Sequence, residues 1–279
     1  MKHSHNSFLR RTARCSSLAL GIVCGISQAS ATTAPSFVDG NTLNVCTAGE
    51  FPPMEYYAKP GDTTMVGFEV DVVTELAKLW GVKPKFVVVD FKGLLPSLDA
   101  HRCGLVASGI MITPERTKRY DGTAYFKSSV VMVTASNSSL KTPDDLSGHL
   151  VAIEAGTTYE KVIADLNAGF AKKGLPPVSM QTYPSSSAVI QQVLVGRAAA
   201  TITQDTSAAF RLMQVPGRLS MPYTYPQGEY YGLYMRRQAN DVQMVKAGLA
   251  SLQRSGVMRT LLRKWNLPED ATSTLNSNQ

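Results

Sequence analysis

One stretch of the sequence, residues 105–116, combines residue types that proteins use to bind anions. An apolar run at 105–107 reads as a short buried strand. Thr113 then has the position of a helix N-cap, because Pro114 and the acidic Glu115 follow it. Arg116 would lie in the first turn of that helix, where the dipole disfavours a cation. Two interpretations of Arg116 are open. It is paired with a nearby carboxylate or solvated at the surface, or its guanidinium binds a ligand carboxylate at the mouth of a cleft.

A second candidate anion site begins at Gly156. Thr157 and Glu160 have the spacing of a capping box, so we expect Thr157 to cap a helix that opens here. Gly156 and the unpaired amides of the first helical turn would also form an anion site. A ligand carboxylate could be shared between this site and Arg116, so the capping and the binding interpretations are compatible.

Gln204 and Asp205 follow an apolar strand and precede a helix that we expect to open at Ala208. Asp205 is either the N-cap of that helix or, if it faces a cleft, a partner for an ammonium group. In the second case an amino acid would be bound at its carboxylate by Arg116 and at its amine by Asp205.

Phe51 lies in a predicted loop after the first strand, next to two prolines. Core packing is one explanation for an aromatic residue in this place. The other is a wall of a ligand cleft, because pockets favour aromatic side chains beside a few polar groups.

The elements that would position these residues alternate between strand and helix in two series. Each series has the order βαβαβ, which specifies a parallel sheet with right-handed crossovers. The first series has strands at 43–47, 86–89 and 105–108 and helices at 69–80 and 93–100. The second has strands at 150–153, 178–182 and 199–202 and helices at 156–174 and 185–195. The strand at 86–89 is almost continuously apolar, so we expect both of its faces to be covered.

These series predict an α/β fold of two lobes, one inserted into the other and joined by two crossing strands. A polar stretch at 136–139 marks the composition change between the lobes, and 230–235 reads as a return strand before two final helices. The ligand cleft is expected at the carboxyl ends of both sheets. The expected ranges are 38–132 plus 226–270 for lobe 1, 133–225 for lobe 2 and 271–279 for a flexible C-terminal tail.

Residues 1–31 have the composition of a secretory signal peptide. A basic start without acidic residues precedes an apolar run at 18–26, and Ala29 and Ala31 give a small-x-small cleavage pattern. The run is too short to span a bilayer, so we expect a periplasmic protein, cleaved after Ala31 and not inserted in the membrane. Without this leader, 24 basic residues remain against 21 acidic ones. A net charge near +3 without a basic cluster gives little support for nucleic-acid binding.

Cys46 and Cys103 are the two cysteines that remain after the leader. In an exported protein they could form one disulfide, or each could be a small buried residue, and the sequence leaves both open. The chain has no clustered Cys and His spacing, so we expect neither a metal site nor a cofactor. A monomer is the expected state.

Four motifs together resemble one known family. They are FPPMEY at 51–56, VGFEVD at 66–71, SGIMITPER at 108–116 and LLRKW at 261–265. The chain from about residue 42 to 268 resembles the periplasmic solute-binding proteins of polar amino acid ABC importers. The resemblance implies a type II periplasmic-binding-protein clamshell, an amino acid or related small carboxylate as ligand, and an inner-membrane ABC permease as partner.

The resemblance also implies ligand-binding roles for particular residues. Met111 stands where many relatives carry Ser or Thr, so a hydroxyl contact to the ligand carboxylate is missing or is replaced by a backbone amide. We favour Asp205 over Gln204 for the α-ammonium, because only a carboxylate compensates its charge. The implied roles are Phe51 as an aromatic cover, Gly109 and Met111 at a strand end of lobe 1, Arg116 at the α-carboxylate, Thr157 and Thr158 around it, and Gln204 or Asp205 at the α-ammonium.

Two other functions stay open. Cyclohexadienyl dehydratases use the same exported clamshell, and TAGEF at 47–51 resembles their first loop. Such an enzyme needs a cleft acid that protonates a leaving hydroxyl, and Glu50, Glu154 and Glu229 are the candidates, although each could equally be a surface carboxylate. The other function is ligand sensing without transport. The motif coverage favours a binding protein for transport that is not an enzyme.

Overall fold

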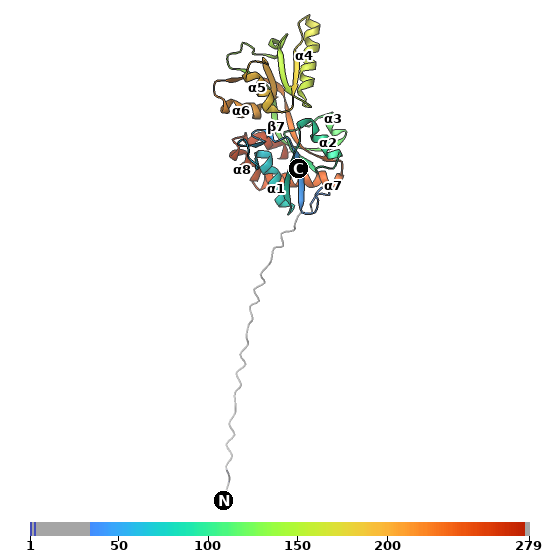
Figure 1. The fold of residues 1–279 in the computed structure, drawn as a ribbon. Coiled ribbons are helices and arrows are strands. Elements are labelled where there is room, and N and C mark those ends of the chain that lie inside the picture. Colours follow the sequence, from blue (N-terminus) through green and yellow to red (C-terminus); the bar gives the residue numbers. More distant parts are fainter. Residues whose placement is uncertain (2, 4–33, 277–279) are drawn as a thin grey trace. The chain divides into compact units, whose positions relative to one another are not determined.

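A computed structural model describes residues 1, 3 and 34–276 of the 279-residue chain (Figure 1). Apart from residues 1 and 3, the predicted signal peptide and its cleavage site after Ala31 lie outside the described residues. The described chain from residue 34 onward belongs to one compact unit. None of the described helices is both long enough and apolar enough to cross a membrane.

Lobe 1 is built on three parallel strands, with β1 paired to β5 on one side and to β6 on the other. These strands are β1 (Thr42–Thr47), β5 (Lys83–Val88) and β6 (Leu105–Val106). A small antiparallel sheet contains β2 (Glu50–Phe51), β3 (Glu55–Tyr57) and β4 (Met65–Val66). The helices of this lobe are α1 (Phe68–Leu79), η1 (Phe91–Gly93), α2 (Leu94–Asp99), α3 (Pro114–Thr117), α7 (Ala239–Arg254), α8 (Val257–Lys264) and η3 (Glu269–Asn276).

Local sequence explains where several of these helices begin and end. Thr113 caps α3 as predicted, since its side chain accepts a hydrogen bond from the backbone N–H of Arg116 at 3.2 Å and Pro114 is the first helical residue. Gly67 precedes α1 with φ +145°, and a Cβ there would lie 2.0 Å from the carbonyl oxygen of Met54. Only glycine therefore allows α1 to begin directly against the β3 segment.

Lobe 2 repeats the pattern, with β8 paired in parallel to β9 and β10. Ser185 caps α5, and Gly174 ends α4 in the left-handed conformation. The elements are η2 (Pro143–Leu146), β8 (Leu150–Glu154), α4 (Tyr159–Lys173), β9 (Ser179–Tyr183), α5 (Ser186–Leu194), β10 (Ala200–Gln204) and α6 (Asp205–Gln214).

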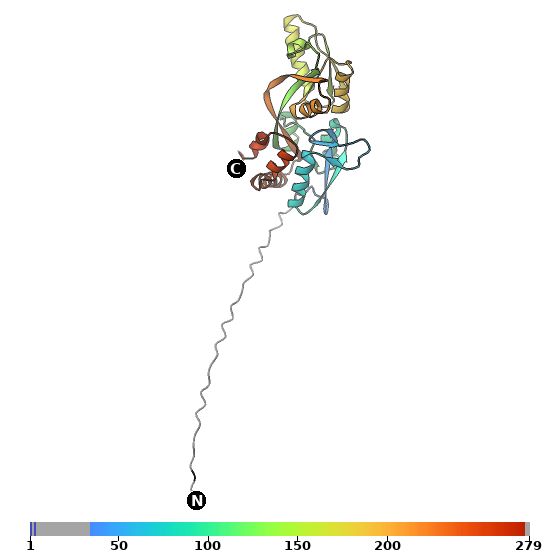
Figure 2. The same ribbon diagram turned by 90° about the vertical axis from the view of Figure 1, so that its left-hand side faces the viewer.

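Two long strands, β7 (Tyr120–Ala135) and β11 (Leu219–Arg236), pass between the lobes (Figures 1 and 2). They pair with each other in an antiparallel manner and join both lobes into one eight-stranded sheet, in the order β5-β1-β6-β11-β7-β10-β8-β9. Their buried aromatic side chains pack into the lobe 1 core, where Phe126 and Tyr231 stack with ring centroids 5.4 Å apart. Because both strands run through both lobes without a break, the residue ranges assigned to the lobes stay a prediction.

The structure differs from the sequence expectations in three places. The apolar run at 86–89 ends β5, which is an edge strand, and Val88 is 47% exposed, so the strand is not covered on both faces as expected. The helix expected at Ala208 begins at Asp205. Residues 271–276, expected to belong to a flexible tail, continue η3, and Ala271 and Thr272 are buried.

The open question about the cysteines is answered by the fold. Cys46 on β1 and Cys103, just before β6, form a disulfide with a Cα–Cα distance of 5.7 Å. The parallel alignment of β1 with β6 brings these two stretches of the chain together, with Cys46 beside Val106, and Cys103 lies three residues before Val106.

Candidate functional site

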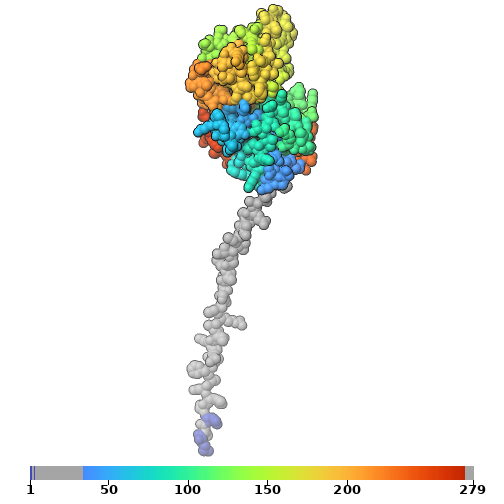
Figure 3. Space-filling view, in the orientation of Figure 1, coloured from blue at the N-terminus to red at the C-terminus, as the bar shows by residue number. Residues whose placement is uncertain are grey.

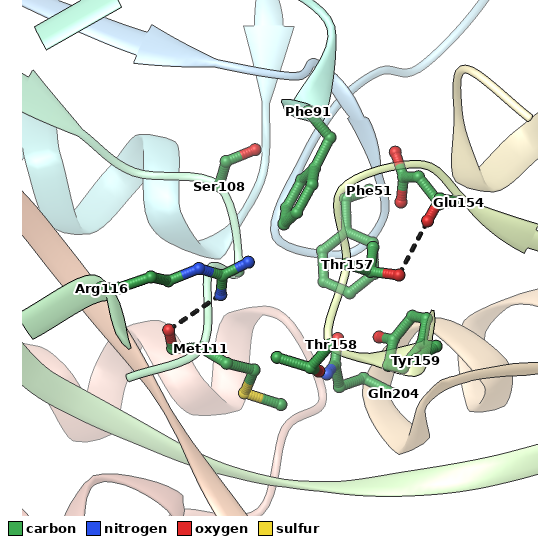
Figure 4. Close-up of a pocket in the computed structure, with 11 residues that line it drawn as sticks. Phe51, Phe91, Ser108, Met111, Arg116, Glu154, Thr157, Thr158, Tyr159 and Gln204 are labelled. Carbon is green, nitrogen blue, oxygen red and sulfur yellow. Dashed lines mark hydrogen bonds between the residues drawn. The ribbon is translucent and has the colours of Figure 1, made fainter. Parts of the chain in front are cut away.

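A pocket lies between the lobes, where the loops after the strands of both lobes meet (Figure 4). Its position agrees with the rule that ligands of α/β sheets bind beyond the carboxyl ends of the strands. Lobe 1 contributes Phe51, Phe91, Ser108, Gly109, Met111 and Arg116, and lobe 2 contributes Glu154, Thr157, Thr158, Tyr159 and Gln204.

Arg116 extends from α3 into this pocket and is held by backbone oxygens rather than by a carboxylate. Its Nη1 donates to the carbonyl of Met111 at 3.0 Å and its Nη2 to the carbonyl of Gly156 at 3.2 Å. None of the ion pairs found among the described residues includes Arg116. Burial lowers the pKa of the Arg116 guanidinium from its ordinary value. Although Glu229 and Glu115 attract the guanidinium, neither pairs with it directly, so its donors are positioned to bind an anion.

Met111 helps to position Arg116 through its backbone. Its carbonyl accepts from both Arg116 and the hydroxyl of Tyr234, the latter at 2.8 Å, and its side chain lines the pocket. A β-bridge to Tyr231 fixes this loop against β11. The Met111 position therefore acts on the pocket through its backbone as well as through its side chain.

Phe51 and Gly109 form a close contact at the wall of the pocket. Gly109 has φ +53°, and a Cβ at this position would lie 2.6 Å from the ring of Phe51. The ring also meets Tyr231 edge to face, with centroids 6.2 Å apart. Core packing and a place in the pocket wall are compatible for Phe51, because it belongs to the lobe 1 core and also lines the pocket.

Two buried carboxyl groups lie behind Ser108 and Gly109. Glu55 accepts a hydrogen bond from the Ser108 hydroxyl at 2.6 Å, and Glu69 accepts from the backbone N–H of Gly109 at 2.8 Å and from the hydroxyl of Tyr125. The second oxygen of Glu55 is buried without a hydrogen-bond partner in the structure. Burial, and next the charge of Glu69, raise the pKa of Glu55 well above its ordinary value. Burial raises the pKa of Glu69 as well, so the pair holds a proton to a higher pH than exposed carboxyl groups do.

The raised pKa of Glu55 has a measurable effect on stability. A carboxyl whose pKa is higher in the folded state than in the unfolded state contributes to stability while it is protonated. This contribution is complete below the unfolded-state pKa of about 4.3 and is lost as the pH rises toward the folded-state pKa. In Glu55→Gln the amide replaces the protonated carboxyl and does not titrate. We expect the free energy of unfolding of the unmodified protein to fall with pH above about 4.3, relative to this variant, by up to about 1.4 kcal/mol per pH unit.

Urea denaturation between pH 4.5 and 8 measures this difference. Glu75→Gln is the matched control, because Glu75 lies on α1 and pairs with Lys78 at the surface. Parallel pH profiles for the unmodified protein and Glu55→Gln would contradict a raised pKa of Glu55.

On the lobe 2 side, Thr157 and Thr158 begin the turn before α4. The prediction that Thr157 caps this helix is wrong, because the N-cap is Thr158 and its side chain makes no capping bond. Thr157 instead donates to the carbonyl of Glu154 at 2.7 Å, since the N-cap of α4 lies one residue later than expected. Glu160 still reaches back and accepts from the backbone N–H of Gly156 at 3.0 Å.

Gln204 and Asp205 take different positions at the junction of β10 and α6. Gln204 is buried and lines the pocket, whereas Asp205 is not among the lining residues. Asp205 is the first residue of α6 and not its N-cap, and its Oδ1 accepts from the Ser128 hydroxyl and from the backbone N–H of Thr206, each at 2.7 Å. The Ser128 hydroxyl also lies within hydrogen-bond distance of that of Tyr231, at 3.0 Å, which places Asp205 behind the aromatic wall formed with Phe51.

Some lining residues were not assigned to ligand binding from the sequence. Phe91 follows β5, Glu154 ends β8, and Tyr159 begins α4. Glu154 was considered only as a catalytic acid, and of the three glutamates considered for that role it alone is a lining residue. The signal that could have identified all of them is their place just after, or at, the carboxyl end of a predicted strand.

The lobes touch across the pocket mouth. The bond from Arg116 to Gly156 connects them, as does the bond from the Ser186 hydroxyl of α5 to the carbonyl of Glu50 at 2.7 Å. In the space-filling view, lobe 2 in yellow and orange lies directly against lobe 1 in blue and green (Figure 3). Within the described part of the chain, no group of three or more His, Cys, Asp or Glu side chains is arranged to hold a metal ion.

Comparisons with known proteins agree with this architecture. The L-cystine-binding protein TcyJ of Escherichia coli (strain K12) is 28% identical over 278 residues, which cover 95% of this chain and 97% of that protein. The solved structure of an ancestral arginine-binding protein bound to arginine matches with a TM-score of 0.74 at 28% identity, covering 81% of this chain and 98% of that one. The ancestral amino acid-binding protein AncCDT-1, a precursor of cyclohexadienyl dehydratase, matches with a TM-score of 0.71 at 28% identity over 81% of this chain and 95% of that one.

All three relatives are named as binding proteins, which agrees with the expectation that the chain is not an enzyme. The family model for bacterial extracellular solute-binding proteins, family 3, matches residues 43–268. That match includes every residue of the pocket. The chain therefore belongs to the bacterial extracellular solute-binding proteins of family 3.

Proposed function

We propose that this protein is the periplasmic substrate-binding component of an ABC importer. It binds an amino acid or a related small carboxylate between its lobes and delivers it, as a monomer, to an inner-membrane permease. The observation that carries this proposal is Arg116, whose guanidinium lies in the inter-lobe pocket, fixed by two carbonyls and without a carboxylate partner among the described residues.

The α-carboxylate of the ligand would bind Arg116, with Thr157 and Thr158 beside it. The α-ammonium would bind Asp205, to whose Oδ2 no described residue donates, or the side-chain oxygen of Gln204, which lines the pocket. Phe51 and Met111 would cover the apolar part of the ligand. Because each lobe contributes some of these contacts, ligand binding favours the closed arrangement, which the permease would recognise.

The contacts proposed for the ligand can supply the free energy of binding that this role needs. Binding at about micromolar affinity needs about 8 kcal/mol net. Two to four charge-assisted hydrogen bonds at about 1.5–3 kcal/mol each, together with burial of the ligand against Phe51, can supply that and offset the ordering costs.

A ligand screen tests the proposal. The mature protein, residues 32–279, should show a raised thermal unfolding midpoint with one class of amino acids and calorimetric affinities near micromolar. Asp205→Asn should weaken that binding at least tenfold if Asp205 holds the α-ammonium, and Gln204→Ala should do so if Gln204 does.

Transport and the enzymatic alternative need separate assays. Deletion of the gene in its host should abolish uptake of the same amino acid at low concentration, whereas a protein that only senses the ligand would leave uptake intact. Consumption of prephenate or arogenate by the purified protein would support the dehydratase alternative. If no amino acid raises the thermal unfolding midpoint, the proposal is wrong.

A further inference from the structure

Glu154 is an acidic side chain of the pocket to which the proposed binding of an α-amino acid gives no role. It is the last residue of β8, is 8% exposed and lines the pocket from lobe 2. Together with Tyr159 it also lines a smaller neighbouring cavity, between α5 and β10, whose wall includes Ile190 and Thr203. The Glu154 side chain therefore lies between the ligand pocket and this second cavity of lobe 2.

No positive charge of the described protein compensates Glu154. None of the ion pairs found among the described residues includes it. The groups that act on it are the carboxylate of Glu50 on β2, the backbone N–H of Ser186 on α5, the hydroxyl of Tyr159 on α4 and the carboxyl of Glu55 on β3. Burial, and next the charge of Glu50, raise its pKa to about 8, and Arg116 does not offset this shift. A buried carboxyl without a cation is costly unless a ligand supplies one.

The position of Glu154 relative to Arg116 decides which part of a ligand it can meet. The two side chains lie on opposite sides of the pocket, with Phe51 and Thr157 between them in the view of Figure 4. In an α-amino acid the ammonium and the carboxylate are bonded to the same carbon atom. A ligand whose carboxylate binds Arg116 therefore keeps its α-ammonium near the Arg116 side, and a group that reaches Glu154 belongs to the other end of the ligand.

Apolar side chains line the path between the two charged groups. Phe51, Phe91 and Met111 all face the pocket and offer no charge. Their surfaces suit methylene groups or a sulfur-containing chain. The pocket thus presents an anion site, apolar side chains and, opposite the anion site, a carboxyl group.

We propose that Glu154 binds a positively charged group at the end of the ligand opposite its α-carboxylate. This inference rests on the proposed amino acid binding at Arg116. Two kinds of ligand share this chemistry: amino acids with a basic side chain, and a double amino acid such as cystine, whose second α-ammonium would reach Glu154.

Matched ligand pairs test the proposal by calorimetry on the mature protein at pH 8. L-arginine and L-citrulline have nearly the same shape and differ in charge, as do L-lysine and L-norleucine. We expect one cationic ligand to bind at least tenfold more tightly than its neutral counterpart, and Glu154→Gln to remove the difference. Binding of L-cystine alone, weakened at least tenfold by Glu154→Gln, would identify the second α-ammonium as the bound cation.

Glu50→Gln is the matched control. It removes a neighbouring carboxylate that does not line the ligand pocket, so the preference for the cationic ligand should remain. Thermal unfolding without ligand checks that Glu154→Gln is folded, and its midpoint should not fall, because the variant removes a buried carboxyl without a cation.

The pH dependence of binding gives a second readout. In the empty pocket Glu154 holds its proton below about pH 8, and a bound cation stabilises the ionised form, so binding releases this proton. Affinity for the cationic ligand should therefore rise with pH, by up to tenfold per unit, and level off near pH 8. The rise should be absent in Glu154→Gln.

The outcomes distinguish this proposal from the one on which it rests. Equal affinity of arginine and citrulline, and of lysine and norleucine, in a protein whose binding still depends on Arg116, would overturn the role of Glu154 alone. A cationic preference that survives in Glu154→Gln would do the same. Failure of every amino acid to bind would overturn both proposals.

Discussion

Arg116→Ala should reduce the affinity for the amino acid ligand by at least a hundredfold. The guanidinium is placed to donate two charge-assisted hydrogen bonds, each worth about 1.5–3 kcal/mol, and every 1.4 kcal/mol lost is a tenfold change in affinity. Arg116→Lys should recover part of the loss, because it keeps the charge but not the planar pair of donors. Isothermal titration calorimetry of both variants measures the effect.

Arg119→Ala is the matched control for this experiment. Arg119 lies just after α3 and pairs with Asp99 at the surface, at 2.8 Å, outside the pocket. Its removal should leave affinity unchanged. Because Arg116 also donates to Met111 and Gly156, thermal unfolding without ligand must accompany the titrations. An Arg116→Ala variant that is folded and binds the ligand like the unmodified protein would disprove the role of Arg116 as the carboxylate site.

Removal of the Cys46–Cys103 disulfide should lower the free energy of unfolding by about 4 kcal/mol. The bond closes a loop with a sequence separation of 57 residues, and the chain-entropy relation for a loop of that length gives this value. For a chain of this size, such a loss corresponds to a drop of roughly 8–16 °C in the unfolding midpoint. The double variant Cys46→Ala, Cys103→Ala tests this by calorimetric unfolding.

Reductant supplies the control for the disulfide. The unmodified protein, unfolded and refolded in reductant, should unfold like the double variant, and the midpoint of the variant should not respond to reductant. Both cysteines are buried, so reduction requires prior unfolding. A double variant with a midpoint within one degree of the oxidised protein would show that this bond is not a main source of stability.

On these proposals, ligand specificity would depend on a few side chains around Arg116. Arg116 would fix the α-carboxylate, which all amino acids share, so it supplies affinity with little discrimination. Glu154 lies on the opposite side and would select among side chains by charge. A change at position 154 alone would then alter the preferred ligand class without loss of the common site.

Much of the fold could be predicted from local sequence patterns. Apolar periodicity and the caps at Thr113 and Ser185 located most helices and strands within a few residues. The alternation of these elements predicted the two parallel series and the crossing strands. The residues to which the resemblance gave ligand-binding roles, except Asp205, line one pocket, while those roles stay a prediction.

What the sequence by itself determined is therefore the order and type of the elements and the stretches that carry the site. These depend on residues a few positions apart, whose backbone preferences and side-chain spacing are readable in the chain. The tertiary structure alone decided that Gln204 and not Asp205 lines the pocket, that Glu55 and Glu69 meet behind Gly109, and that Glu154 lies opposite Arg116. Each of these depends on strand register and on the contact between the lobes, which place residues far apart in the sequence within reach of one another.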